Sequence, residues 1–109
     1  MGPSSADKMR ALLGLAMRGR KLALGRAACR QAAGERRLAL VLIARDAGAS
    51  AERDGAADRA TECLRLGLDK QQLGSMVGRD SVAILGVLDP HLASGLLAIA
   101  RAAEDLPQP

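Results

Sequence analysis

The sequence predicts an α/β fold: a three-layer α-β-α sandwich with about four strands in a central sheet and five helices. First, segments with helical apolar periodicity alternate with short apolar segments along the whole 109 residues. Second, the short segments 38–44 and 81–88 show no polar alternation, as is typical of strands covered on both faces. Third, the chain is 49% hydrophobic without any Phe, Tyr or Trp, which indicates one core of aliphatic side chains and methionine. Regular alternation places helices on both faces of the sheet.

The first element is expected to be a helix starting at Asp7. Its apolar residues recur at helical spacing on one face: Met9, Leu12, Leu13, Ala16 and Met17. Gly19 is expected to stop this helix, with Arg18 at the negative end of the helix dipole. Residues 1–6 are predicted to be a disordered tip.

The next three elements follow a strand-helix-strand order. The segment 21–24 reads as a short strand, and Gly25 allows a sharp turn into a helix over 26–34. The segment 38–44 is then expected to be a buried strand.

The second half repeats the pattern. A short helix is expected within 48–60 and a strand over 62–68. Asp69 can cap a helix over 70–77, because Gln72 stands three positions further on, as in a capping box. The Gly78 that follows is expected to end it.

The chain closes with a strand over 81–88 and a long helix that starts at Asp89-Pro90. One domain over residues 7–105 is therefore expected, with 106–109 as a C-terminal tail. No linker or internal repeat interrupts it.

Charge is unevenly distributed along the chain. Residues 1–45 hold ten Lys or Arg against two acidic residues, whereas residues 46–109 hold six basic and ten acidic ones. This asymmetry indicates one basic surface and a polyanionic partner. A solvated surface with uneven sequence placement is the alternative. The absence of aromatic side chains excludes base stacking as the main mode of nucleic-acid binding.

Several basic groups are expected beside loops suited to a phosphate chain. Gly25 and Arg26 open the second helix, whose first N–H groups and positive dipole end can face an anion. Arg30 lies one helical turn from Arg26 on the same face. The other members of this predicted shared surface flank the same turn or end neighbouring elements: Arg18, Arg20, Lys21, Arg45 and Arg79.

Catalytic and metal-binding patterns are not found. The sequence has no HExxH, GxSxG or P-loop motif, and the single histidine, His91, is expected at the surface. Cys29 and Cys63 lack metal-ligand spacing and are expected to be buried free thiols, with a disulfide or metal pair as the alternative. The acidic residues Glu52, Asp54 and Asp58 are expected to form a solvated face. We therefore expect no enzyme, no catalytic residue, no metal and no cofactor.

Three segments together resemble a known family. They are "LLGLAMRGRKLALGRAACRQAA", "LALVLIARDA" and "KQQLGSMVGRDSVAILGV". Over about residues 9–100 they are similar to the kink-turn-binding ribosomal-protein superfamily (large-subunit ribosomal protein seven-Ae or thirty-e type), and more narrowly to its bacterial YlxQ-like branch. The resemblance implies an α-β-α sandwich that binds structured RNA, ribosomal RNA above all.

The resemblance also implies where RNA would be contacted. The start of the second helix would enter an RNA bend. The loop after the strand over 38–44 would lie beside it, and the loop before the last strand would brace it. The residues at these positions are Gly25, Arg26, Arg30, Arg45, Asp46, Arg79, Asp80 and Ser81.

The chain departs from the family at the positions that read bases. Kink-turn readers carry an Asn-Glu pair after the glycine, where this sequence has Ala27 and Ala28, and Gln31 replaces the usual lysine. Contact with phosphates through arginines is therefore expected, with weak sequence preference. The alternative function is a protein-interaction module that has lost kink-turn recognition.

The localisation expected from the sequence is cytoplasmic. The longest apolar runs, 11–17 and 38–44, reach only seven residues, which is too short to cross a bilayer.

Overall fold

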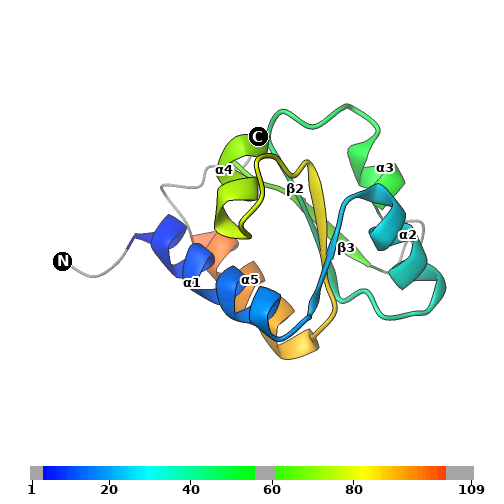
Figure 1. Ribbon diagram of the computed structural model, residues 1–109, viewed down its shortest axis with the longest axis horizontal. Coiled ribbons are helices and arrows are strands. Elements are labelled where there is room, and N and C mark those ends of the chain that lie inside the picture. Colours follow the sequence, from blue (N-terminus) through cyan, green and yellow to red (C-terminus); the bar gives the residue numbers. More distant parts are fainter. Residues whose placement is uncertain (1–3, 56–60, 103–109) are drawn as a thin grey trace.

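The computed structural model describes residues 4–55 and 61–102. Within them the chain forms five helices and four strands, shown in Figure 1. In chain order these are α1 (Ser5–Arg18), β1 (Leu22–Leu24), α2 (Arg26–Gly34), β2 (Leu40–Ile43), α3 (Ala51–Gly55), β3 (Glu62–Arg65), α4 (Lys70–Met76), β4 (Ile84–Val87) and α5 (Pro90–Ala102). The predicted order of elements is confirmed.

The four strands form one mixed sheet in the order β1-β4-β2-β3. β2 and β3 are parallel, whereas β4 runs antiparallel to both β1 and β2. Helices α1, α4 and α5 cover one face, and α2 and α3 cover the other, as Figure 1 shows. The predicted three-layer sandwich is therefore confirmed.

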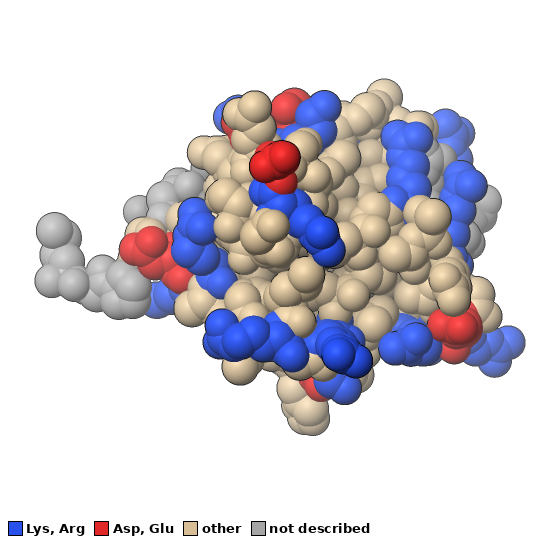
Figure 2. Space-filling model, viewed as in Figure 1, with Lys and Arg blue, Asp and Glu red and all other residues tan. Residues whose placement is uncertain are grey.

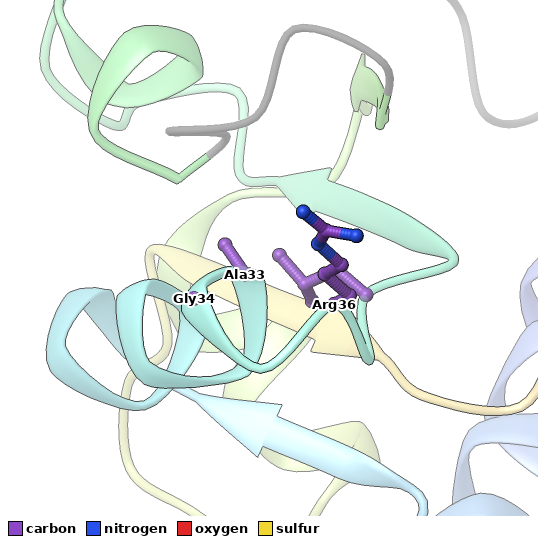
Figure 3. Close-up of a pocket in the computed structure, with 4 residues that line it drawn as sticks. Ala33, Gly34 and Arg36 are labelled. Atoms are coloured by element: carbon purple, nitrogen blue, oxygen red, sulfur yellow. The ribbon is translucent and has the colours of Figure 1, made fainter.

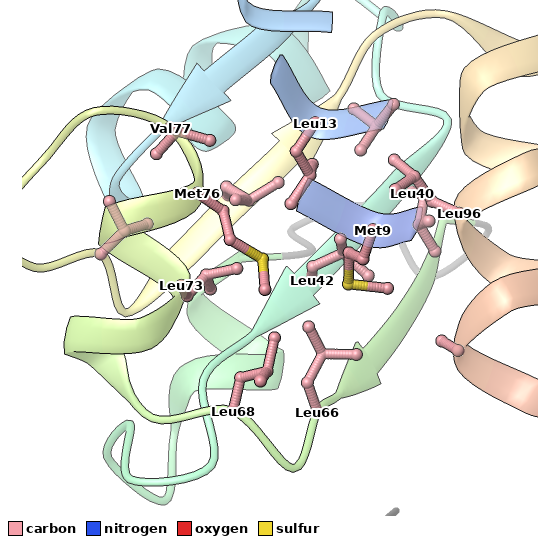
Figure 4. Close-up of a cluster of buried hydrophobic side chains, with 14 of the residues drawn as sticks. Met9, Leu13, Leu40, Leu42, Leu66, Leu68, Leu73, Met76, Val77 and Leu96 are labelled. Carbon is pink, nitrogen blue, oxygen red and sulfur yellow. The ribbon is translucent and has the colours of Figure 1, made fainter. Parts of the chain in front are cut away.

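The two faces of the sheet carry two different cores. Strand β2 divides its residues between them: Leu40 and Leu42 point to the α1, α4 and α5 side, and Val41 and Ile43 to the α2 and α3 side. All four are buried, which explains why this strand shows no polar alternation. The first core is built of leucine and methionine from three helices (Figure 4): Met9, Leu13, Leu73, Met76 and Leu96. The second is made largely of small residues: Ala23, Cys29, Ala32 and Ala51.

Helix starts follow the expected capping chemistry. α1 begins at Ser5, two residues before the predicted start, because the Ser4 hydroxyl accepts a hydrogen bond from the Asp7 N–H at 3.1 Å. The predicted N-terminal tip is thus shorter than 1–6. Residues 1–3 and the predicted tail 106–109 lie outside the described residues.

The predicted capping box of α4 is confirmed. The Asp69 carboxylate accepts from the Gln72 N–H and the Gln72 side chain accepts from the Asp69 N–H, each at 2.8 Å. The Asp89 carboxylate likewise accepts from the N–H groups of His91 and Leu92 at the start of α5. These hydrogen bonds hold the pKa of Asp89 below its usual range, the Leu92 N–H having the largest effect.

The predicted ends of α1 and α2 are confirmed, because α1 ends at Arg18 with Gly19 as its C-cap and α2 ends at Gly34. Neither glycine adopts the left-handed conformation that often ends a helix. Instead Arg20 and Arg36 do, each at φ 58°. In both motifs the N–H groups of this arginine and of the next residue return to carbonyls of the last turn, which is the Schellman arrangement. An arginine thus occupies the position that usually favours glycine, twice.

Among the described residues, no helix combines the length and apolar character that crossing a bilayer requires.

Candidate nucleic-acid interface

The predicted basic residues lie at two opposite ends of the sheet. Strand β1 runs beside β4, with the Lys21 carbonyl accepting from the Leu88 N–H at 2.8 Å and the Gly25 N–H donating to the Ile84 carbonyl at 2.9 Å. A strand rises about 3.3 Å per residue, so the backbones of Lys21 and Gly25 lie roughly 13 Å apart. Arg18, Arg20 and Lys21 therefore lie apart from the other predicted basic residues, at the other end of β1.

We name the two surfaces by a central residue. The Lys21 end comprises Arg18, Arg20 and Lys21 together with the neighbouring Arg36 and Arg37. The Gly25 end comprises the remaining predicted residues except Arg30, which lies one turn further along α2: Gly25, Arg26, Arg45, Asp46, Arg79, Asp80 and Ser81.

A pocket of about 330 Å³ lies at the Gly25 end. Its lining joins the turn before α2 to the loop before β4: Leu24, Gly25, Arg79, Ser81, Val82 and Ala83. Gly25 has φ 88°, which a side chain would disfavour, and no side chain caps the helix start. The first N–H groups of α2 therefore lack the capping side chain that many helices carry, and they point along the positive end of the helix dipole.

The loop before β4 is held tightly against α4. The Arg79 N–H donates to the Gly74 carbonyl at 2.9 Å, and the Val82 N–H donates to the Lys70 carbonyl at 2.9 Å. A Cβ added to Gly74 would lie 2.8 Å from the Ser81 nitrogen and 2.9 Å from the Arg79 carbonyl oxygen. Only glycine allows this approach, so the "LG" of the sequence motif positions the loop that carries Arg79.

The β2–α3 loop brings Arg45 and Asp46 to the same end. The Arg45 N–H donates to the Leu68 carbonyl at 2.7 Å, while its guanidinium is 3.8 Å from the Asp69 carboxylate and its side chain is 59% exposed. The Asp46 carboxylate accepts from the Lys70 N–H at 2.9 Å, so it ties this loop to the start of α4. Asp46, one of the predicted contact residues, therefore stabilises the position of this loop.

Arg26 reaches the same loop from α2. A Cβ built on Gly48 would lie 3.9 Å from the Arg26 Nη2 atom, which places that guanidinium beside the β2–α3 loop. The turn into α2 and two loops therefore meet at the Gly25 end, although they come from three separate parts of the chain.

Arg65 on β3 supports this loop and was not among the predicted site residues. Its guanidinium makes two hydrogen bonds to the Glu52 carboxylate, at 2.8 and 2.7 Å, and it also donates to carbonyls of the loop. The Arg65 hydrogen bond holds the pKa of Glu52 below its usual range. An arginine inside the otherwise apolar segment "CLRLGL" was the sequence signal that could have identified it.

The exposed side of α2 offers few polar atoms near its start. Ala27 is exposed and Ala28 half-buried, whereas Arg30 and Gln31 are exposed further along the helix. Any ligand against the first turn would meet backbone N–H groups and arginines, without an amide or carboxylate at the two alanine positions.

The Lys21 end is also hollowed and basic. One pocket of about 250 Å³ has Arg20, Gln31 and Arg37 in its lining, and another of about 450 Å³ is lined by Ala33, Gly34, Arg36 and Leu38. In Figure 3 the side chains of Ala33 and Arg36 point into the same space. Figure 2 shows basic side chains in separate groups over α2 and α3, near α4 and along the edge below the end of α1, with acidic side chains between and beside them.

The two cysteines are free thiols. Cys29 is buried, and burial, with a smaller effect from Cys63, raises its pKa to about 11. Cys63 is half-buried, and its pKa is raised mainly by burial. In the part of the chain that the structure describes, no group of three or more His, Cys, Asp or Glu could hold a metal ion.

The class of fold that emerges is an α-β-α sandwich, and solved structures share it. A protein of unknown function from Bacillus halodurans is 28% identical, with a TM-score of 0.77 over 86% of this chain and 97% of that chain. The 15.5kD RNA binding protein of Giardia lamblia is 13% identical, with a TM-score of 0.67 over 95% of this chain and 92% of that chain. No family model matches the sequence, and no curated protein matches it.

Proposed function

We propose that this chain is a non-catalytic RNA-binding protein of the ribosomal-protein type, in the YlxQ-like branch of the kink-turn-binding superfamily. It contacts structured RNA, ribosomal RNA above all, in the cytoplasm. One observation carries the proposal: Gly25, Arg79 and Ser81 line one pocket, and the Arg26 guanidinium lies against the loop that follows Arg45 and Asp46. The shared fold with an RNA binding protein supports it.

The Gly25 end suits a bent phosphate backbone. The first N–H groups of α2 and the positive end of its dipole favour an anion directly in front of Gly25. Arg26 opens α2, Arg79 lines the pocket beside Gly25, and Arg45 follows β2 at the same end of the sheet. Guanidinium groups can bind phosphate oxygens through two parallel hydrogen bonds. The protein therefore contacts RNA at this end through the phosphate backbone of the RNA.

Base recognition is expected to be weak. Phosphate contacts position a nucleic acid, whereas side chains that reach base edges specify its sequence. Ala27 and Ala28 provide no such side chains where kink-turn readers carry an Asn-Glu pair. We therefore expect similar affinities for different bent RNAs of the same length.

A salt titration tests the proposal. The full chain is titrated against a fluorescein-labelled RNA hairpin with a purine-rich internal loop at several salt concentrations. If about five phosphates are contacted, the logarithm of affinity falls with the logarithm of salt at a slope of about −3.5 to −4.5. Binding with a slope near zero, or no binding, contradicts the proposal.

A second experiment addresses the cellular RNA and the alternative role. RNA crosslinked to the protein in cells is sequenced, with the triple variant of Arg26, Arg30 and Arg45 as control. Enrichment of ribosomal RNA that the variant loses supports the proposal. Protein partners that persist after ribonuclease treatment, without a shift of the RNA hairpin, favour the protein-interaction module instead.

A further inference from the structure

Arg65 makes more polar contacts than its place on an edge strand requires. Its Nη1 atom donates to the carbonyls of Ala47 at 2.9 Å and Arg45 at 3.1 Å, with Ala44 at 3.4 Å. Its Nη2 atom donates to the Gly48 carbonyl at 3.0 Å, in addition to the carboxylate of Glu52. The side chain is 18% exposed, so one guanidinium satisfies four carbonyls of a single loop from its inner side.

We infer that Arg65 is a positioning residue for RNA binding: it holds the β2–α3 loop so that Arg45 faces the RNA beside Arg26. The inference rests on the proposed function and adds a residue that need not touch RNA itself. Arg65 draws the loop carbonyls inward, and the Arg45 side chain, 59% exposed, is left on the outer surface.

The fork shape of the guanidinium is what this role requires. Five N–H donors in one plane serve the two Glu52 oxygens and the loop carbonyls together, whereas a lysine ammonium has three donors at a single point. Glu52 belongs to the first turn of α3, so the ion pair also fixes the helix that follows the loop. Loop, helix and strand are joined through one side chain.

The loop that Arg65 holds also borders Arg26. Because the Arg26 guanidinium lies beside Gly48, a displaced loop would move Arg45 and would also change the surroundings of Arg26. On its other side, the loop is fixed by the Arg45 N–H to Leu68 and by Asp46 to Lys70. Loss of Arg65 therefore loosens the loop from one side without unfolding the sheet.

The test is a double-mutant cycle with the labelled RNA hairpin described above. Arg65→Lys is expected to weaken binding about fivefold at 0.1 M salt and to reduce the salt slope by about 0.8, equivalent to the loss of one phosphate contact. In an Arg45→Ala background, the same change is expected to alter Kd less than twofold, since the contact that Arg65 positions is already gone. Equal losses in both backgrounds, or no loss in either, overturn the inference.

Two further variants complete the design. Arg101→Lys is the control, because Arg101 on α5 also pairs with a carboxylate of β3, that of Glu62, at 2.6 Å, and the change should leave Kd unchanged. If Arg65→Lys does not fold, as judged by circular dichroism, Glu52→Gln takes its place in the cycle, with an expected loss of about twofold that again vanishes without Arg45.

The outcomes separate the two proposals. If the wild-type protein fails to bind the hairpin, the proposed function fails. If it binds, and Arg45→Ala weakens binding while Arg65→Lys does not, only the role of Arg65 fails.

Discussion

The two basic ends of the sheet place their arginines in opposite electrostatic surroundings. At the Lys21 end, α1 and α2 both terminate, and Arg18, Arg20 and Arg36 lie where the helix dipole favours cations. At the Gly25 end, α2 begins, and Arg26 occupies its first turn, where the dipole disfavours a cation. The helix dipoles therefore stabilise the arginines of the Lys21 end, whereas Arg26 is placed against the field of α2.

The ends also differ in how their loops are held. The Lys21 end uses backbone hydrogen bonds of the two Schellman motifs, with Arg37 paired to Glu35 at 3.3 Å. The Gly25 end uses side chains from distant elements: Arg65, Asp46, Asp69 and the close approach at Gly74. A surface that must keep its shape for a ligand is expected to be supported in this second way.

The largest expected effect comes from removing three charges on and beside α2, two of them at the Gly25 end. Replacing Arg26, Arg30 and Arg45 together by Ala is expected to lower RNA affinity about 100-fold at 0.15 M salt, because each phosphate contact contributes about 0.7–0.9 to the salt slope. The matched triple variant replaces Arg18, Arg20 and Lys21 and should lose less than about tenfold, as expected if no more than one of these residues contacts a phosphate. Fluorescence anisotropy measures both, and equal losses would show that the two ends contribute alike.

The next effect concerns the support of the Gly25 end. Gly74→Ala is expected to destabilise the protein by about 2 kcal/mol, because its Cβ would be forced against the backbone of Arg79 and Ser81. The control is Gly34→Ala at the Lys21 end, where a Cβ meets nothing within 4 Å and stability should rise slightly. Urea unfolding measures both. A Gly74 variant as stable as the wild type would mean that the loop adjusts freely.

A smaller effect depends on pH through the Glu52 carboxylate. Since Arg65 holds the pKa of Glu52 lower in the folded chain, this group contributes stability above the usual glutamate range, and that contribution is lost as the pH falls through the depressed pKa. Glu52→Gln should cost about 1 kcal/mol at neutral pH. Below the folded-state pKa the difference should shrink. Urea unfolding at a series of pH values checks this, and a difference that does not change with pH would be evidence against it.

The smallest effect tests the left-handed arginine of the Lys21 end. Arg20→Gly is expected to raise stability by about 0.5 kcal/mol, since the steric cost of φ 58° is removed while glycine loses more chain entropy. Arg18→Gly, inside the last turn of α1, should instead lower stability by about 1 kcal/mol. Thermal unfolding compares the two. Destabilisation by Arg20→Gly would show that the Arg20 side chain itself stabilises the turn.

Sequence patterns predicted the helix starts well, because the hydrogen bonds that cap a helix join residues close together in the sequence. The capping box of Asp69 and Gln72 and the cap at Asp89 depend on neighbours within three residues, and the structure contains both. The helix ends at Gly19 and Gly34 were predicted for the same reason, but the left-handed residues after them, Arg20 and Arg36, were not. Which residue becomes left-handed depends on where the chain must turn next.

The sequence by itself determined the alternation of helices and strands, the strand β2 buried on both faces, and the excess of basic residues before position 46. Only the tertiary structure decided which of those basic residues meet. Strand direction is set by pairing between distant segments, and because β4 runs antiparallel to β1 and β2, the loop before β4 lies at the same end of the sheet as Gly25 and the loop after β2. For the same reason Arg65, remote in sequence from Gly48, becomes its neighbour. Long-range packing makes such contacts, and no local pattern specifies them.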